Sequence, residues 1–204
     1  MITEDDVAWF ECDLDDLWIF DKLILSRKLG YSCGPVDSWV PKPDWYIVRP
    51  ISNFAGMGRD AIREFIRRET TYLPAGHFWC EEFKGRHLSV DYIDKEQVLA
   101  TEGFKDNEDG PLFMWSKWKK IKEHVPYPKI LDTLKGDYRY INCEFIGDKL
   151  IEVHLRLNTD MGDYNEIIPM WESDRYATKS LVLEAEGWTW HEDKDYKRLG
   201  FWKK

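Results

Sequence analysis

Two glutamates in a candidate β-hairpin have the chemistry of a divalent-metal site. Glu144 and Glu152 lie in the segments 139–145 and 149–157, which flank a Gly-Asp dipeptide at 147–148. Both segments carry apolar and β-branched residues and the dipeptide favours a turn, so we expect two antiparallel strands. Mg²⁺ usually takes one or two carboxylates from the protein together with substrate phosphates. The pair is therefore a candidate magnesium site.

The register of the hairpin decides whether the two carboxylates share a face, because side chains alternate between faces along a strand. A two-residue turn at 147–148 pairs Glu144 with Ile151 and separates the two glutamates. A three-residue loop, 146–148, instead pairs Glu144 with Leu150. The residues that then share the face of Glu144 are Glu152, His154 and Arg156. The plainer alternative is a charged face exposed to solvent.

A second group of residues suits phosphate binding. The short apolar segment 45–50 predicts a strand that contains Arg49, and the following loop of small residues contains Gly56 and Gly58. A short glycine cluster most often serves only a turn. Here it brings mobile backbone N–H donors close to a fixed cation, and this combination suits a triphosphate.

The elements that would position these residues follow from apolar spacing and turn signals. Apolar residues at helical spacing predict a helix over 15–29, with Gly30 as its C-cap. The other predicted elements are helices over 60–69 and 114–124, strands over 77–82 and 88–93 that form a hairpin or a crossover between sheets, an exposed loop over 102–111, and a tail from 173 that is first helical and then aromatic and basic.

Composition excludes some classes of function. The chain has 204 residues, 43% of them hydrophobic, so it is long and apolar enough to fold around its own core. Its net charge is -9 and it has no long basic stripe, which argues against bulk nucleic-acid binding. Aromatic residues near the end of the chain could stack on a base or sugar, but such residues more often fill a core. They are Trp188, Trp190 and Trp202.

Cysteines and hydropathy indicate a reducing compartment. The four cysteines lack the close spacing of a zinc site or redox pair, so we interpret them as buried thiols. The start of the chain is acidic where a signal peptide has a basic segment, and no apolar run reaches the length of a membrane span. We therefore expect a cytoplasmic protein without a membrane partner.

Four segments, in order along the chain, resemble those of ATP-grasp enzymes. They are FDKLILSRKLGYSCGP, YIVRPISNFAGMGRDA, FWCEEFKGRHLSVDYI and INCEFIGDKLIEVHLRLN, and the resemblance covers about residues 15–158. It implies an α+β protein with the ATP-grasp fold, in which two α+β subdomains clamp a nucleotide between them. The implied organisation is a single domain, with a nucleotide lid over about 36–87, a metal-site subdomain over about 88–170 and a tail over 171–204.

The resemblance also implies roles for individual residues. Lys22 and Arg49 would hold the α and β phosphates of ATP, and Glu144 and Glu152 would bind Mg²⁺. His154 would be a third metal ligand. Arg156 would steady an acyl phosphate and is, with Lys22 and Arg49, an implied catalytic residue. The other implied nucleotide contacts are Asn53, Gly56 and Gly58 in a glycine-rich flap and Glu81, Glu82, Phe83 and His87 along a hinge strand.

The chain departs from the family pattern at four points. Arg49 replaces the more usual lysine, and its planar fork suits phosphate as well. His154 replaces asparagine, so the third metal position is filled by His154, by Asn158 or by a water. The turn between the two glutamates is shorter than usual. The N-terminal lobe that normally precedes this fold is almost absent.

The function that the resemblance implies is ATP-dependent ligation. Enzymes of this family generally activate a carboxylate as an acyl phosphate, which an amine or similar nucleophile then attacks. The expected partners are thus ATP with Mg²⁺, a carboxylate and an amine acceptor, either small or macromolecular. Two alternatives stay open: a kinase that phosphorylates a hydroxyl, and a catalytically silent nucleotide-binding or protein-interaction module.

Overall fold

The computed structural model describes residues 4–52, 58–107, 110–158, 160–174, 176–195 and 197–204. The helices are α1 Glu4–Glu11, η1 Leu14–Phe20, α2 Lys22–Lys28, η2 Lys129–Thr133 and α3 Tyr176–Ala185, of which η1 and η2 are 3₁₀ helices. The strands are β1 Cys33–Pro35, β2 Asp44–Pro50, β3 Ile62–Ile66, β4 His77–Glu81, β5 His87–Ile93, β6 Glu96–Phe104, β7 Lys117–Lys120, β8 Tyr140–Ile146, β9 Lys149–His154, β10 Glu166–Trp171, β11 Thr189–Asp195 and β12 Arg198–Lys203. In these residues, no helix is long and apolar enough to cross a membrane.

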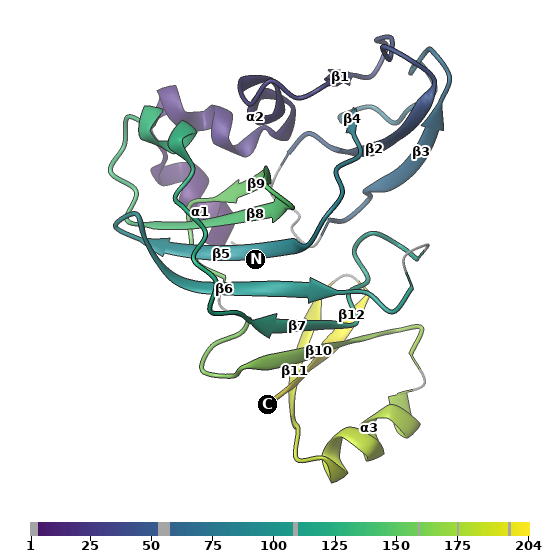
Figure 1. Cartoon of the computed structure of the whole chain (residues 1–204), viewed down its shortest axis with the longest axis vertical. Coiled ribbons are helices and arrows are strands. Elements are labelled where there is room, and N and C mark those ends of the chain that lie inside the picture. The colour runs from purple at the N-terminus through teal and green to yellow at the C-terminus, as the bar shows by residue number, and fades with distance from the viewer. Residues whose placement is uncertain (1–3, 53–57, 108–109, 159, 175, 196) are drawn as a thin grey trace.

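The strands form two antiparallel sheets (Figure 1). The smaller sheet has the order β1-β4-β2-β3, and the larger has the order β11-β12-β10-β7-β6-β5-β8-β9. The segment between β4 and β5 crosses from the small sheet to the large one, so these strands form a crossover and not a hairpin. α1, η1 and α2 lie beside the β8-β9 end of the large sheet, and α3 lies near its other end. The α+β class predicted from the sequence is confirmed.

The predicted helix over 15–29 is interrupted at Asp21. This residue is extended, with φ -105° and ψ 101°, and forms an isolated bridge with Ser52. Its side chain accepts a hydrogen bond from the Ile24 amide at 2.8 Å and so caps the N-terminus of α2. The chain therefore forms two short helices, and Lys22 begins the second. Gly30 has φ +75°, which agrees with the predicted C-terminal cap.

Two predicted helices are wrong. The segment 60–69 contains β3, which pairs with β2 and buries Ile66 completely. The segment 114–124 contains β7, which fills the gap between β6 and β10 in the large sheet. Both segments are rich in charged residues with good helix propensity, but pairing with neighbouring strands outweighs a preference of a few tenths of a kcal/mol per residue.

The tail is helical and then aromatic, as predicted, but its aromatic part is a β-hairpin of β11 and β12. β12 pairs with β10, so the tail extends the large sheet. Trp202 is 1% exposed, and Trp188 and Trp190 pack in the same cluster. These tryptophans fill a core. The four cysteines are free, and three of them are buried, while Cys33 is only half-buried.

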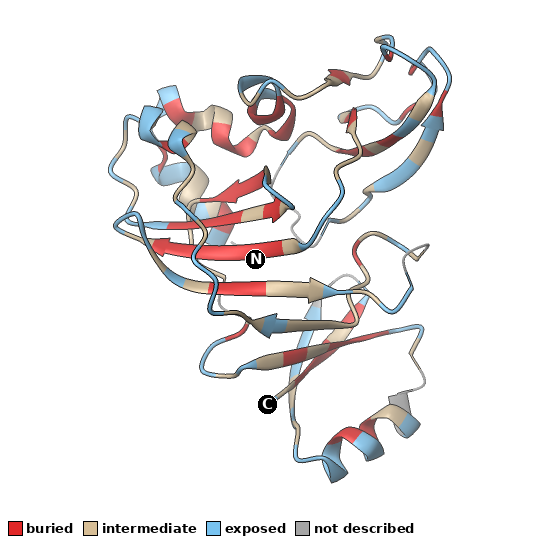
Figure 2. Cartoon of the chain, in the orientation of Figure 1, coloured by how far each residue is buried: buried red, intermediate tan, exposed pale blue. Residues whose placement is uncertain are grey.

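The β5, β8 and β9 strands are largely buried (Figure 2), and their side chains alternate between an apolar and a polar face of the sheet. Alternate residues such as Val90, Cys143 and Val153 are fully buried and pack with residues from η1 and α2. The residues between them face the other side of the sheet. These are Ser89 and Asp91 on β5, Asn142 and Glu144 on β8, and Glu152 and His154 on β9. The fold thus concentrates polar side chains on one face, at the β9 edge.

Candidate functional site

A β-bulge places the two candidate metal ligands directly opposite each other. Ile146 pairs with Lys149 and Phe145 with Leu150 across a two-residue turn, but Glu144 then pairs with Glu152. The extra residue in β9 is Ile151. Both registers considered from the sequence are therefore wrong. The two-residue turn occurs, yet the bulge restores both carboxylates to one face.

The turn of this hairpin lies against the segment that connects the two sheets. The Gly147 amide donates to the Arg86 carbonyl at 2.8 Å, and a Cβ added to Gly85 would lie 2.8 Å from the Gly147 Cα. This close approach brings the start of β5 over the hairpin, where His87 Nε2 lies 3.1 Å from Glu144 Oε2. The predicted hinge residue His87 is thus at the carboxylate pair.

Glu152 is buried among cations. It is 5% exposed, and its Oε1 lies 3.6 Å from Lys22 Nζ and 3.5 Å from His154 Nε2. Burial alone would raise the pKa of Glu152, but the charges of Lys22, His154 and Arg49 lower it well below its usual range. The carboxylate is therefore ionised, and the alternative of a solvated charged face does not fit Glu152.

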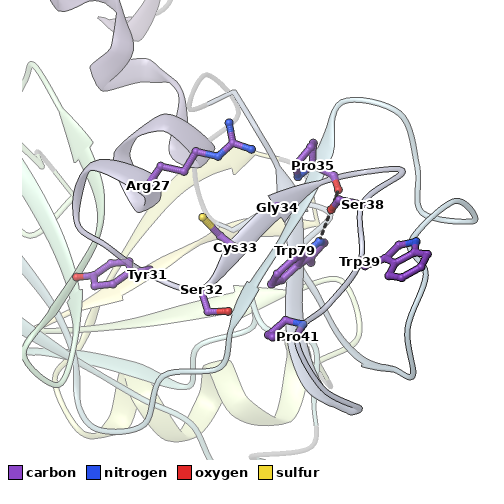
Figure 3. Close-up of a pocket in the computed structure, with 10 residues that line it drawn as sticks. All are labelled: Arg27, Tyr31, Ser32, Cys33, Gly34, Pro35, Ser38, Trp39, Pro41 and Trp79. Carbon is purple, nitrogen blue, oxygen red and sulfur yellow. Dashed lines mark hydrogen bonds between the residues drawn. The ribbon is translucent and has the colours of Figure 1, made fainter.

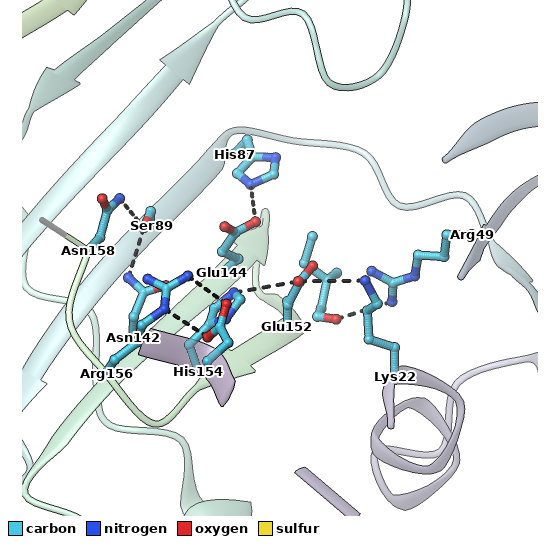
Figure 4. A network of polar contacts seen from close by, with 12 residues as sticks. Lys22, Arg49, His87, Ser89, Asn142, Glu144, Glu152, His154, Arg156 and Asn158 are labelled. Atoms are coloured by element: carbon cyan, nitrogen blue, oxygen red, sulfur yellow. Dashed lines mark hydrogen bonds and ion pairs between the residues drawn. The ribbon is translucent and has the colours of Figure 1, made fainter. Parts of the chain in front are cut away.

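The two predicted phosphate cations meet at this edge of the sheet (Figure 4). Arg49 on β2 is 7% exposed, and its Nη2 donates to the Ile151 carbonyl at 3.1 Å. Its buried Nε has no hydrogen-bond partner in the described part of the chain. Burial and the charge of Arg49 lower the pKa of Lys22, and Glu152 offsets part of that effect. An unsatisfied buried guanidinium N–H is costly, and an anion would satisfy it.

On the other side of Glu152, His154 and Arg156 share a carboxylate that the sequence analysis missed. Asp5 Oδ1 lies 2.7 Å from Arg156 Nε and 3.3 Å from His154 Nδ1, and Asp5 Oδ2 lies 3.1 Å from Arg156 Nη2. Burial opposes charge on His154, but Asp5 and Glu152 raise its pKa to about 9. The imidazole is protonated near neutral pH with both nitrogens engaged, and this argues against a role as metal ligand.

The side chain of Asn158, the other candidate for the third metal position, is engaged by the protein itself. Its Nδ2 donates to Ser89 Oγ at 3.2 Å, and its Oδ1 accepts from the Asp160 amide at 3.1 Å. Among the described residues, no group of three or more His, Cys, Asp or Glu side chains has the arrangement of a metal site. The two glutamates fit Mg²⁺ only in the mode in which phosphate oxygens and waters complete the coordination.

The hinge carboxylates are engaged by the protein itself. Glu81 Oε1 accepts from the Ser32 amide at 2.8 Å. Glu82 forms a two-point ion pair with Arg63, at 2.7 and 3.1 Å, and a third contact with Lys84. The ring of Phe83 packs edge-on against Tyr31 with 4.7 Å between centroids. The side chains of Glu81 and Glu82 thus have structural partners.

Some predicted residues lie away from these contacts. Gly58 has φ +64° and lies near the Phe113 backbone. Asn53 and Gly56 lie outside the described residues. A cavity of about 410 Å³ (Figure 3) lies between the end of α2, β1 and Trp79, and it shares no residue with the polar contacts of Figure 4.

A second polar cluster on the same face was also missed. Asn142 Nδ2 donates to Ser89 Oγ at 2.9 Å and to Asp91 Oδ1 at 2.8 Å, and the Asn158 amide donates to Asp91 Oδ1 at 2.9 Å. The polar residues of SVD and NCE, two apart in buried strands, were a signal that could have revealed it.

Comparison with solved structures identifies the fold. A protein from Archaeoglobus fulgidus, described as an ATP-grasp superfamily protein, matches with a TM-score of 0.54 and 15% identity over 91% of this chain and 64% of that one. N5-carboxyaminoimidazole synthetase from Staphylococcus aureus, complexed with ADP, matches with a TM-score of 0.56 and 12% identity over 92% of this chain and 67% of that one. Carboxyaminoimidazole ribonucleotide synthase from Aspergillus clavatus, complexed with ATP, matches with a TM-score of 0.56 and 10% identity over 91% and 68%.

This chain therefore has the ATP-grasp fold, as its sequence segments predicted. It spans about two thirds of the length of these structures. No family model and no curated protein matches the sequence. Because the sequence identities are low, the structural similarity defines the fold but not the reaction.

Proposed function

We propose that this protein binds ATP with Mg²⁺, activates a carboxylate as an acyl phosphate and joins it to an amine. The observation that carries the proposal is the bulged hairpin, which places Glu144 opposite Glu152 beside Lys22 and Arg49, whose Nε has no hydrogen-bond partner among the described residues. Two carboxylates and two cations, of which Glu152, Lys22 and Arg49 are buried and Glu144 is half-buried, match the needs of a metal-bound triphosphate.

The residues present fit the metal. Glu144 and Glu152 would hold Mg²⁺, which supplies positive charge to the oxygens of the transferring phosphoryl group when it is bound. Both are hard oxygen donors, and Glu152 is ionised. His87 would orient Glu144 through the 3.1 Å contact. We do not include His154 among the ligands because its ring is charged and both nitrogens are engaged.

In this proposal the two cations bind the phosphates of the nucleotide. Lys22 and Arg49 hold the α and β phosphates, and the Nε of Arg49 gains the partner that it lacks. Gly58 would help to exclude water from the phosphates. Since Glu81 and Glu82 are engaged elsewhere, the adenine would contact backbone groups of the hinge and the apolar face that includes Phe83.

Arg156 would steady the acyl phosphate. Within the described part of the chain, Asp5 and the Leu157 carbonyl accept hydrogen bonds from three of its five N–H donors. The other two are available to a ligand. Asp5 holds the guanidinium in place and thus fixes where that charge is presented. In this proposal residues 36–87 act as the lid and residues 88–170 as the metal-site subdomain. Free thiols are consistent with action in a reducing cytoplasm.

Two assays test the proposed function. Saturating Mg-ATP or a non-hydrolysable analogue should raise the melting temperature by mass action. With the right acid, ADP should form, and hydroxylamine should trap the activated carboxylate as a hydroxamate. ADP with a stable phosphorylated product and no hydroxamate would assign a kinase. A thermal shift without ADP under any acid would assign a silent nucleotide-binding module, and no shift at all would overturn the proposal.

A further inference from the structure

The polar face of the large sheet has an order along β5 that sets positions for the reactants. The hinge segment leads into β5 at His87, Ser89 pairs with Glu144, and Asp91 pairs with Asn142. On the next strand, Glu144 pairs with Glu152 and Asn142 with His154. Successive rows are two residues, or about 7 Å, apart. The row of Asp91 therefore lies one step beyond the two glutamates, on the side away from the hinge.

Given the proposed function, this order leaves the row of Asp91 for the acceptor. The adenine lies at the hinge and the phosphates lie at Glu144 and Glu152. The carboxylate that receives the terminal phosphoryl group, and the nucleophile that attacks it, must then lie further along the face. Asp91 is the acidic side chain that β5 contributes there.

The contacts of Asp91 divide between its two oxygens. Its Oδ1 accepts from Asn142 Nδ2 at 2.8 Å and from the Asn158 amide at 2.9 Å. Within the described residues Oδ2 has no hydrogen-bond partner, although Asp91 is only 3% exposed. Oδ2 also keeps some contact with solvent, because it does not belong to the fully buried polar atoms that lack a partner. One oxygen thus anchors the carboxylate, and the other is open to a ligand.

We propose that Asp91 is the general base of an acceptor subsite for a primary amine. The inference rests on the proposed function and adds a residue and a ligand class to it. Cations flank the other side of this row, because His154 and Arg156 are held there by Asp5. The acyl phosphate would face these cations while the amine nitrogen faces Asp91 Oδ2. Burial raises the pKa of Asp91, which agrees with a group that accepts a proton.

The step balances without another reactant. The amine enters as its ammonium, and Asp91 Oδ2 accepts one proton from nitrogen to give the neutral amine. The amine then attacks the carbonyl carbon of the acyl phosphate, and a C–N bond forms. The C–O bond to phosphate breaks, its electron pair leaves with the phosphate, and the second proton from nitrogen passes to that leaving group. Asp91 releases its proton to solvent, so the products are an amide, hydrogen phosphate and a proton.

The first test separates the two half-reactions. Asp91→Asn keeps the shape of the side chain and an oxygen for the anchoring hydrogen bonds, but removes the base. With the acid identified by the hydroxamate screen, trapping by hydroxylamine should stay within about twofold of wild type, because this nucleophile is neutral near pH 7 and needs no base. Amide formation from methylamine should fall by about 100-fold or more.

Ser89→Ala is the matched control. Ser89 Oγ accepts from the same two asparagines, Asn142 and Asn158, so the variant loses anchoring contacts but keeps the Asp91 carboxylate. Its ratio of amide to hydroxamate should equal that of wild type. The proposal is overturned if Asp91→Asn forms amide at the wild-type rate, or if Ser89→Ala shows the same selective loss of amide.

A binding measurement keeps the inference testable if no acid is turned over. Methylammonium is titrated into the protein with Mg²⁺ and a non-hydrolysable ATP analogue, and the Asn158 amide is followed by NMR because it donates to Asp91. A saturable shift in wild type and Ser89→Ala, absent in Asp91→Asn, supports the subsite. No shift in wild type, or equal shifts in all three, overturns it. Absence of ADP and hydroxamate in wild type would count against the proposed function alone.

Discussion

The two arginines at the polar edge of the large sheet are in opposite states. Arg49 has a buried Nε without a partner in the described part of the chain, whereas Arg156 is held at two points by Asp5. Both carry the same charge, but Arg49 acts on Glu152 directly, whereas Arg156 is linked to it through Asp5 and His154 (Figure 4). This contrast supports the proposal that the Arg49 side binds an anion, while the Arg156 side is stabilised by the chain itself.

The largest expected effect comes from Glu152→Gln, because Glu152 joins the two sides. Loss of its charge removes a proposed metal ligand, and turnover should fall by about 100-fold to 1000-fold. Lys22 and His154 would also lose their shared carboxylate, and removal of one partner from a buried pair costs about 3–5 kcal/mol. Urea unfolding and an ADP assay measure both effects. Wild-type turnover by a folded variant would refute the metal assignment.

Arg49→Met should sharpen the comparison by separating binding from stability. Methionine fills similar space without a cation. The variant loses the hydrogen bond from Nη2 to the Ile151 carbonyl together with a buried Nε that has no described partner, so the free energy of unfolding should fall by no more than about 1.5 kcal/mol. Loss of hydrogen bonds to charged phosphate should weaken Mg-ATP affinity by about 10-fold to 100-fold. Calorimetric titration gives the affinity. Unchanged affinity would remove Arg49 from the phosphate site.

On the Arg156 side, protonation of His154 should make the free energy of unfolding depend on pH. The pKa of His154 is raised from an ordinary 6.5 to about 9, so the folded state binds the proton more tightly than the unfolded chain. This contribution is complete below pH 6.5 and is lost as pH rises to about 9. The free energy of unfolding should fall by up to about 3 kcal/mol over that window.

His154→Gln is the control for this pH dependence, since it removes the titrating group and should flatten the profile between these limits. Denaturant unfolding at a series of pH values measures the slope. An equal slope in the variant would place the titration elsewhere.

The smallest expected effect is that of Gly147→Ala, which perturbs the turn that supports both sides. Gly147 has φ +60°, and a Cβ there would lie 2.9 Å from the Lys84 carbonyl oxygen. The strained backbone and the contact should cost about 1–2 kcal/mol. Asp148→Ala, an exposed neighbour in the same turn, should change stability by less than about 0.5 kcal/mol. Equal unfolding midpoints for the two variants would show that the hairpin tolerates a side chain at Gly147.

Strand signals in the sequence were sufficient for the parts of the fold where apolar residues alternate or run together. The strands around Arg49 and Val90 and both arms of the Glu144–Glu152 hairpin occur where they were expected. The charged segments that became β3 and β7 were misread as helices. Their local preference is weak, and only the neighbouring strands that pair with them decide their conformation.

Ordered sequence segments were enough to single out Glu144, Glu152, Lys22 and Arg49 as candidate site residues before any geometry was known. Their arrangement in space depends on strand pairing and on contacts between distant segments. A bulge at Ile151 is a property of pairing and not of composition, and it alone puts the two glutamates opposite each other. Asp5 meets Arg156 across 151 residues of sequence, so no local pattern could have paired them.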